Sequence, residues 1–275
     1  MKLGLVVHAE RRQAHEVARQ VVAEARRRGM ELVTRAHQAE WLDVGSADLS
    51  APGVDVLMAI GGDGTVLEAV ELALQADAPV VGINVGRLGF LAEVEPPELE
   101  GALDALAAGD WQESLRTTVQ ARLRGGRPVV GVNDVVVDKS FSPRTVALGI
   151  EVDERHFITY HADGVVVATP TGSTAYNYSA GGPLVDPELP ALVLTAVAPH
   201  SLFTRSMVFP AARALRVTVQ GDRMAGLAVD GRPVASLGPG DWVDVSAGPT
   251  PVRFVRIGPR GFAERVGGKL GVGDA

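Results

Sequence analysis

The sequence contains no cysteine, which excludes disulfides, thiolate zinc sites, iron–sulfur clusters and a cysteine nucleophile. Its net charge of −7 provides no overall field that would attract nucleic acid or an anionic membrane surface. No apolar run approaches the roughly 18 residues of a membrane-spanning helix, and the run at residues 3–7 is too short for a signal-peptide core. We therefore expect a cytoplasmic protein that binds neither nucleic acid nor membranes.

The chain does contain enough apolar material for one large domain or two ordinary ones. Of its 275 residues, 46% are hydrophobic and 21% are charged, which is typical of a globular protein. Residues 3–7, 54–60 and 79–85 are short apolar runs that favour strands buried on both faces of a sheet. Residues 14–25 carry apolar side chains at helical spacing, and residues 66–74 are predicted as a second helix. This alternation predicts βαβ units.

The pattern changes after about residue 111, where strand signals dominate. Residues 115–123 alternate apolar and polar side chains, and Asp153, Glu154 and Arg155 are predicted to form a hairpin loop. The other strand-like segments are residues 129–137, 146–152, 156–160, 165–168, 192–197, 215–219 and 252–257. A run of strands after a strand–helix alternation indicates a second, β-rich domain.

We therefore predict an α/β fold class with two domains. An N-terminal βαβ-type domain occupies residues 1–115, and an all-β, sandwich-like domain follows at residues 116–257. The C-terminal segment, at about residues 258–275, is expected to return to the first domain and to contain a helix.

A glycine-rich turn, Gly-Gly-Asp-Gly-Thr, lies at residues 61–65 between a predicted strand and a predicted helix. Glycine lets the backbone approach a ligand closely, and the amides at a helix start attract anions, so the turn is suited to phosphates. It matches neither the P-loop nor the Gly-x-Gly-x-x-Gly fingerprint. The plain alternative is a tight turn in which Asp63 or Thr65 caps the helix. Asp63 favours phosphoryl transfer, because a carboxylate beside phosphates is repulsive unless it holds a metal ion or accepts a proton.

Two further polar segments lie in the strand-rich part. Asn133 and Asp134 interrupt an apolar stretch, which by itself is typical of a turn. Residues 161–183 combine glycines and small hydroxyl side chains with Tyr176 and Tyr178. The tyrosines favour an ordered surface for a flat polar ligand over a flexible loop.

Together these three segments resemble the NAD kinase family, which uses ATP to phosphorylate the 2′-hydroxyl of the adenosine ribose of NAD. The resemblance runs from about residue 54 to the end of the chain, and it includes residues 84–91, residues 199–201 with Arg205, and the tail at residues 262–271. It implies a kinase that makes NADP.

The same resemblance implies a role for individual residues. Asp63 would be the general base on the ribose hydroxyl, and Phe90 would be an apolar neighbour of the adenine. Asp134 stands where the family often has glutamate, and Arg232 stands where several members have glutamine. The implied nucleotide-binding residues are Gly61, Gly62, Gly64, Thr65, Phe90, Asn133, Asp134, Arg144, His161, Asp163, Thr171, Thr174, Ala175, Tyr176, Asn177, Tyr178, Ser179 and Arg232.

A divalent cation, Mg²⁺ or Mn²⁺, is expected as a cofactor, because an acidic chain with few lysines must offset the charge of the triphosphate of ATP. We expect ATP to chelate most of it, and the sequence contains no dedicated metal site. The resemblance also implies a homo-oligomer, either a dimer or a tetramer.

Two other functions are compatible with parts of the pattern. A lipid kinase of the diacylglycerol type shares the motif at residues 61–65, but it would be expected to have a membrane-binding surface, and the sequence has no basic amphipathic helix beyond a solvated helix face at residues 11–28. A non-catalytic dinucleotide sensor would keep residues 161–183 but would have no need of Asp63.

Overall fold

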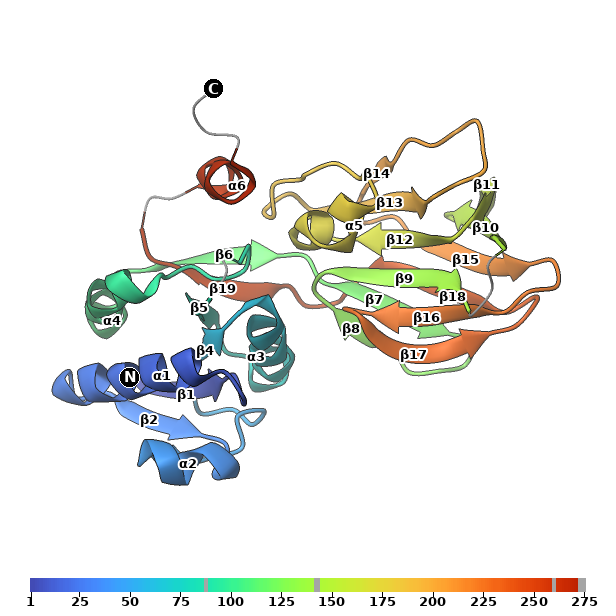
Figure 1. The fold of residues 1–275 in the computed structure, drawn as a ribbon. Helices are drawn as coiled ribbons and strands as arrows, with labels where there is room; N and C mark the ends of the chain where they lie inside the picture. Colours follow the sequence, from blue (N-terminus) through green and yellow to red (C-terminus); the bar gives the residue numbers. More distant parts are fainter. Residues whose placement is uncertain (87–88, 141–143, 259–260, 272–275) are drawn as a thin grey trace. The chain divides into compact units, whose positions relative to one another are not determined.

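The structure is a computed structural model that describes residues 1–86, 89–140, 144–258 and 261–271 (Figure 1). The chain divides into two compact units, the first formed by residues 1–115 with 252–275 and the second by residues 116–251. Within the described ranges, no helix has the length and apolar character needed to cross a membrane.

The first unit is built on a seven-stranded sheet with the order β3-β2-β1-β4-β5-β19-β6. Strands β1, β2, β3, β4, β5 and β19 pair in parallel with their neighbours in this order. Its elements are β1 (Lys2–Val7), α1 (Arg12–Arg27), β2 (Glu31–Thr34), α2 (Ala36–Leu42), β3 (Gly45–Ser46), β4 (Val56–Gly61), α3 (Asp63–Ala76), β5 (Val80–Asn84), the 3₁₀ turn η1 (Pro96–Glu98), α4 (Leu99–Ala108), β6 (Gln112–Arg116), β19 (Val252–Arg256) and α6 (Phe262–Leu270).

Helices cover both faces of this sheet, which is why β4 and β5 are buried along their whole length. The apolar faces of α1, α2 and α4 share one core with alternate residues of the strands, such as Leu3, Leu5 and Met58. Helix α3 lies on the opposite face, where a Cβ on Gly82 would lie 3.0 Å from Val66. Helix α3 is therefore packed tightly enough against the sheet to fix the turn that precedes it.

The second unit consists of two six-stranded antiparallel sheets, with the orders β11-β10-β15-β18-β7-β8 and β14-β13-β12-β9-β16-β17. Alternate residues of both sheets form one apolar core, as expected for a sandwich. Its elements are β7 (Val119–Leu123), β8 (Val129–Gly131), β9 (Asp134–Lys139), β10 (Val146–Val152), β11 (Arg155–Ala162), β12 (Gly164–Ala168), the 3₁₀ turn η2 (Thr171–Thr174), α5 (Tyr176–Ser179), β13 (Ala191–Val197), β14 (Met207–Pro210), β15 (Leu215–Gln220), β16 (Ala225–Val229), β17 (Arg232–Leu237) and β18 (Trp242–Ala247).

These observations confirm the predicted fold class. The predicted hairpin loop is also confirmed, because β10 and β11 pair directly and both Asp153 and Glu154 have positive φ angles (48° and 64°), as in a type I′ turn. The C-terminal helix is present as α6 in the first unit. Residues 259–260 and 272–275 of the predicted returning segment, and Arg87 and Leu88 of the segment at residues 84–91, lie outside the described residues.

Several predictions about single elements were wrong. Residues 115–123 are not one strand: β6 ends at Arg116, Arg116 is buried, and Leu115 is 55% exposed. The alternation changes phase at this point because the chain passes from the first unit to the second. The strand predicted at residues 252–257 is β19, which pairs with β5 in the first sheet instead of joining the β-rich unit. The helix predicted at residues 66–74 begins earlier, at Asp63.

Candidate active site

The glycine-rich turn connects the end of β4 to the start of α3. A Cβ on Gly61 would lie 2.2 Å from the hydroxyl of the buried Thr65. Any residue other than glycine at position 61 would therefore clash with Thr65. Gly64 is exposed and has open space around it. The free N–H groups of the first turn of α3 therefore lie beside a backbone that a ligand can approach closely.

Asp63, the first residue of α3, carries a carboxylate that the chain holds in one orientation. Its two oxygens accept hydrogen bonds from the backbone N–H groups of Phe90 (3.1 Å) and Leu91 (3.2 Å). A Cβ on Gly89 would lie 2.1 Å from Asp63 Oδ1, so glycine is what allows this approach. The Asp63 side chain remains 37% exposed, so a substrate hydroxyl can still reach it.

A pocket of about 490 Å³ opens beside this carboxylate. The residues that line it are His8, Ala9, Glu10, Arg11, Gly62, Asp63, Gly64, Thr65 and Glu68. Arg11 donates a hydrogen bond to the carbonyl of Val85, and a Cβ on Gly86 (φ 110°) would lie 2.6 Å from the Arg11 guanidinium. A fixed guanidinium and a helix N-terminus give the pocket the donors that phosphate groups require.

The C-terminal helix brings a second cation to Asp63. The Lys269 ammonium lies 3.9 Å from Asp63 Oδ2 and 3.6 Å from the centre of the Phe90 ring. Burial lowers the pKa of Lys269, and the nearby Asp63 carboxylate partly opposes this shift. Helix α6 also contacts the rest of the unit through an ion pair between Arg265 and the half-buried Glu93 (2.8 Å).

In the second unit, Asn133 and Asp134 lie where the predicted strand 129–137 is in fact broken into β8 and β9. The cause of the break is Asp230, whose carboxylate accepts hydrogen bonds from the N–H groups of Val132 (2.7 Å), Asn133 (2.7 Å) and Asp134 (3.0 Å). These hydrogen bonds hold residues 132 and 133, which connect β8 in one sheet of the sandwich to β9 in the other.

Asp134 is 4% exposed, and no described residue donates a hydrogen bond to its carboxylate. Burial, with a smaller contribution from the neighbouring carboxylate of Asp230, raises its pKa to about 7. Close to neutral pH the Asp134 carboxyl group is therefore present in both its protonated form, which can donate a hydrogen bond, and its ionised form, which can only accept one.

The segment after β12 lies over the outer face of the sheet β14-β13-β12-β9-β16-β17. Its fixed point is Asn177, which is fully buried: its amide donates to the carbonyls of Ser173 (3.2 Å) and Pro183 (3.0 Å) and accepts from the Thr195 hydroxyl (2.7 Å). A Cβ on Gly172 would lie 1.9 Å from the Asn133 carbonyl oxygen, so η2 lies directly against the Asn133–Asp134 turn.

The other predicted residues of this segment differ in exposure. Thr171 is buried, and its hydroxyl has no hydrogen-bond partner among the described residues. Thr174 and Ala175 are half-buried, and Tyr176, Tyr178 and Ser179 are exposed. These residues belong to an ordered segment, η2 and α5, as the two tyrosines in it predicted.

Acidic groups lie close to Tyr176. Burial raises the pKa of Tyr176, with smaller contributions from the carboxylates of Asp138, Asp163 and Asp134. Asp163, just before β12, forms an ion pair with Lys139 (2.7 Å). Two predicted acidic residues, Asp134 and Asp163, therefore lie within electrostatic range of a third predicted residue, Tyr176.

Three other predicted residues of this unit are exposed. His161 is exposed on β11, Arg232 is exposed at the first position of β17, and Arg144 is exposed just before β10. The predicted residues as a whole fall into two sets, with Gly61 to Phe90 in the first unit and Asn133 to Arg232 in the second.

Sequence reasoning missed two residues that organise these sets. Asp230 is one, and its signal was present, because Asp230-Gly231 lies between alternating apolar positions and both residues have positive φ angles (48° and 73°), as a two-residue hairpin requires. Lys269 is the other, and no local pattern around residue 269 indicates that it would contact Asp63.

A glycine-rich turn with a fixed carboxylate, in an α/β unit joined to a β-sandwich, is the arrangement expected of a nucleotide-dependent phosphotransferase. Family models support this class: residues 44–111 match the ATP-NAD kinase N-terminal domain and residues 132–257 match the ATP-NAD kinase C-terminal domain. The chain is 38% identical to an NAD kinase of Moorella thermoacetica over 100% of this chain and 90% of the relative. It is 40% identical to an NAD kinase of Heliobacterium modesticaldum, over 94% and 95% of the two chains. The chain belongs to the NAD kinase family.

Solved structures share the fold. A yeast NADH kinase complexed with NADH matches with a TM-score of 0.91 and 23% identity over 100% of this chain and 89% of that one. An NAD kinase from Archaeoglobus fulgidus in complex with ATP matches with a TM-score of 0.75 and 22% identity over 92% and 93% of the two chains.

Proposed function

We propose that this chain transfers the γ-phosphoryl group of ATP to the 2′-hydroxyl of the adenosine ribose of NAD, with Asp63 as the general base. The carboxylate takes the hydroxyl proton while the ribose oxygen forms a bond to the γ-phosphorus, and the bond from that phosphorus to the bridging oxygen breaks to release ADP. The observation that carries the proposal is the Asp63 carboxylate, held by two backbone N–H groups at the mouth of a pocket.

In this proposal the triphosphate of ATP occupies the pocket beside α3. The N–H groups of the first turn, the open backbone at Gly62 and Gly64, and the Arg11 guanidinium supply the contacts that orient and neutralise phosphates. Positioning and charge neutralisation are what phosphoryl transfer mainly demands of a protein.

The divalent cation fits this site as a companion of ATP. In the part of the chain that the structure describes, no three His, Asp or Glu side chains form a group that could hold a metal ion by themselves. Asp63 and Glu68 line the pocket, and Mg²⁺ or Mn²⁺ is commonly held by one or two carboxylates together with substrate phosphates. When bound, the cation offsets the charge of the triphosphate.

The acceptor NAD is assigned to the second unit, which carries Asn133, Asp134, Asp163, Thr171 and Tyr176. The buried hydroxyl of Thr171 and the buried carboxylate of Asp134 have no protein donor or acceptor among the described residues, so both suit hydrogen bonds to a ligand. The same proposal includes the weaker assignments of His161, Arg144 and Arg232, a cytoplasmic location, and a homo-oligomeric assembly.

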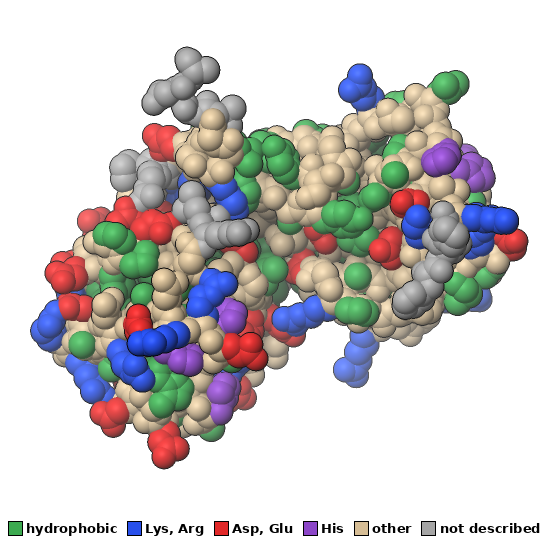
Figure 2. Space-filling model, viewed as in Figure 1, with side chains coloured by type: hydrophobic (Ala, Val, Ile, Leu, Met, Phe, Trp, Pro, Cys, Tyr) green, Lys and Arg blue, Asp and Glu red, His purple; other side chains and the backbone are tan. Residues whose placement is uncertain are grey.

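Neither alternative accounts for both sets of residues. A lipid kinase needs a membrane-facing surface, whereas Figure 2 shows acidic and basic side chains interspersed over the face that it displays. A dinucleotide sensor needs no carboxylate at the glycine-rich turn, whereas Asp63 is held there by two hydrogen bonds.

The test is to incubate the chain with NAD, Mg²⁺ and ATP, and in parallel with polyphosphate, and to measure NADP. Formation of NADP with either donor supports the kinase assignment. Failure with all donors, alongside retained NAD binding, would indicate the sensor instead.

A further inference from the structure

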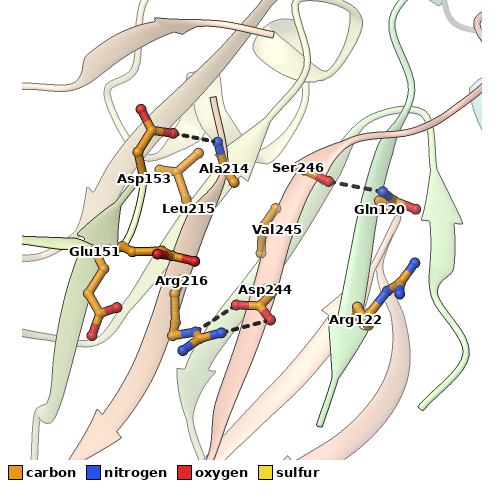
Figure 3. A pocket seen from close by; sticks show the side chains of 11 residues that line it. Gln120, Arg122, Glu151, Asp153, Ala214, Leu215, Arg216, Asp244, Val245 and Ser246 are labelled. Carbon is orange, nitrogen blue, oxygen red and sulfur yellow. Dashed lines mark hydrogen bonds and ion pairs between the residues drawn. The ribbon is translucent and has the colours of Figure 1, made fainter. Parts of the chain in front are cut away.

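A hollow of about 330 Å³ lies on one sheet of the second unit, and charged residues in it satisfy one another. Arg216 on β15 and Asp244 on β18 are cross-strand neighbours joined by two hydrogen bonds, 2.7 and 3.1 Å long (Figure 3). Pairing across an exposed sheet explains these two charges without a ligand. The pocket of the first unit, beside Asp63, is organised differently.

Part of the wall of that pocket is the loop at residues 8–11, which connects β1 to α1. The loop carries Arg11, whose guanidinium lies 3.8 Å from the position of a Cβ on Gly62 and 2.6 Å from that of a Cβ on Gly86. Glycine at both positions therefore makes room for it. Among the described residues Arg11 donates one hydrogen bond, to the carbonyl of Val85, so further N–H groups of the guanidinium can meet a phosphate.

Two histidine side chains fix the backbone of this loop. His15, in the first turn of α1, has its Nε2 atom 3.2 Å from the carbonyl oxygen of His8 and 2.9 Å from that of Ala9. Carbonyl oxygens can only accept, so Nε2 carries the hydrogen and donates it to them. The Nδ1 atom of His8 accepts from the backbone N–H groups of Glu10 and Arg11 (3.3 Å each). The path of the loop, and with it the position of Arg11, depends on both imidazoles.

The His15 ring is itself supported by helix α2. It packs on the ring of Trp41, with the ring centres 4.6 Å apart and the planes tilted by 39°. Trp41 packs in turn against the core of the first unit, and the Arg19 guanidinium lies 5.6 Å from the centre of its ring. His15 is therefore held by an aromatic contact as well as by its hydrogen bonds to the loop.

Helix α2 reaches the pocket at two more points. Gln38, which is 4% exposed, donates a hydrogen bond to the carbonyl of Val7 (2.7 Å), directly before the loop. Arg35, the N-cap residue of α2, forms an ion pair with Glu68, which lines the pocket. These two residues and Trp41 are spaced three positions apart, so they are successive neighbours on one side of the helix. One side of a short helix thus supports two parts of the pocket wall.

These contacts do more than bury apolar surface. Ala9, Glu10 and Arg11 are exposed, so burial does not fix the loop. Loops that only connect two elements are usually the more mobile parts of a fold. An exposed loop that polar side chains hold in one path is what a site needs in order to present a charged group to a ligand.

We propose that His15 is a positioning residue for the phosphoryl donor and that it acts through Arg11. His15 fixes the carbonyls of residues 8 and 9, and the loop then holds the Arg11 guanidinium where a phosphate can meet it. This inference rests on the function proposed above, in which the triphosphate of ATP occupies this pocket. Loss of His15 should therefore weaken the binding of ATP and spare that of NAD, whose assigned residues belong to the second unit.

The first measurement compares the KM values for ATP and for NAD in wild type and in His15→Phe, with Mg²⁺ present. Phenylalanine keeps a ring against Trp41 but cannot donate to the two carbonyls. We expect the KM for ATP to rise about tenfold, while kcat and the KM for NAD stay within about twofold of wild type. Calorimetric titration with MgATP in the absence of NAD should show the same loss of affinity.

Two amide variants separate hydrogen bonding from packing. Glutamine at position 15 places an amide N–H as many bonds from the backbone as the Nε2 atom of His15, whereas asparagine is one bond shorter. His15→Gln should therefore keep the wild-type KM for ATP, and His15→Asn should raise it as His15→Phe does. The asparagine variant also supplies the result if circular dichroism shows that the phenylalanine variant does not fold.

A double-mutant cycle tests whether His15 acts through Arg11. Arg11→Met should itself raise the KM for ATP by about tenfold or more, because it removes the phosphate contact. Adding His15→Phe should then raise the KM for ATP by less than about twofold, since the contact that His15 positions is already lost. His37→Phe, at an exposed position of α2, is the matched control and should behave as wild type.

Four results would each overturn the inference: an unchanged KM for ATP in His15→Phe, an equal rise in the KM for NAD, a His15→Gln variant as weak as His15→Asn, or an undiminished effect of His15→Phe when Arg11→Met is present. If the wild type makes NADP and the His15 variants bind MgATP normally, only the role of His15 is lost. If the wild type makes no NADP, the kinase assignment fails, and the MgATP titrations still decide the role of His15.

Discussion

Asp63 and Asp134 make the most informative comparison in this protein, because both are carboxylates beside sharp turns and the chain treats them differently. Each oxygen of Asp63 accepts a backbone N–H, and Lys269 lies nearby. Asp134 is buried, receives no such donor from the described residues, and lies close to Asp230, which has taken the available N–H groups. A held and accessible carboxylate suits proton transfer, whereas a buried one with a pKa near 7 suits hydrogen bonding to a substrate.

The largest effect is expected for Asp63→Asn. Asparagine keeps the size of the side chain, but it cannot take a proton, and its amide nitrogen cannot accept one of the two backbone N–H groups that hold Asp63. Turnover should fall roughly 10²–10⁴-fold, equivalent to about 3–5 kcal/mol of barrier, while the lost N–H acceptor costs only about 1 kcal/mol of stability. Asp110→Asn, on an exposed loop, is the control and should leave NADP formation unchanged. Near-normal turnover of Asp63→Asn would exclude Asp63 as the general base and leave it the structural role of holding residues 90 and 91.

The raised pKa of Asp134 should appear in the pH dependence of the free energy of unfolding. Its pKa is about 7 in the folded chain and 3.8 when unperturbed, so the folded state keeps a proton that the unfolded state loses between these pH values. Stability therefore falls as pH rises through this window, and Asp134→Asn removes that loss. The free energy of unfolding of the variant, relative to wild type, should rise by about 3 kcal/mol from pH 5 to pH 8. Urea unfolding at both pH values measures it, and a difference independent of pH would contradict the burial argument.

Asp230→Ala should cost about 2–3 kcal/mol of unfolding free energy, because three backbone N–H groups lose their acceptor at once. NAD binding should weaken as well, since the Asn133–Asp134 turn would no longer be fixed. Asp222→Ala, an exposed aspartate in another turn, provides the comparison. Equal stability of the two variants would mean that the turn does not depend on Asp230.

Lys269→Met should have the smallest effect. It removes a cation held over Phe90 at 3.6 Å and a part-exposed ion pair with Asp63, which together contribute about 1 kcal/mol. We expect turnover to change by less than about fivefold, with the orientation of Asp63 preserved by the two backbone N–H groups. A loss as large as that of Asp63→Asn would make Lys269 part of the catalytic machinery.

Sequence patterns predicted well the helices, strands and turns that depend on residues close together in the chain. Buried strands, the helix at residues 14–25, the turn at residues 61–65 and the Asp153–Glu154 hairpin were all visible in the sequence, because apolar periodicity and turn residues act over a few positions. The break between β8 and β9 was not visible, because it depends on Asp230, about a hundred residues away along the chain.

The same limit applies to the site. The motif pattern and the family resemblance indicated Asp63 and Asp134, but they did not show that the two carboxylates have different environments. The N–H groups that hold Asp63 come from residues 90 and 91, and the carboxylate beside Asp134 comes from residue 230. Lys269 reaches Asp63 only through the return of α6 to the first unit. Long-range contacts of this kind leave no periodic signal in the sequence.

The measurement that tests the comparison most directly is NADP formation as a function of NAD concentration for wild type, Asp63→Asn and Asp134→Ala under identical conditions. The account predicts that Asp63→Asn loses kcat with little change in KM, whereas Asp134→Ala raises KM and retains most of kcat. A normal KM with a collapsed kcat for Asp134→Ala, together with an active Asp63→Asn, would contradict it by exchanging the two roles.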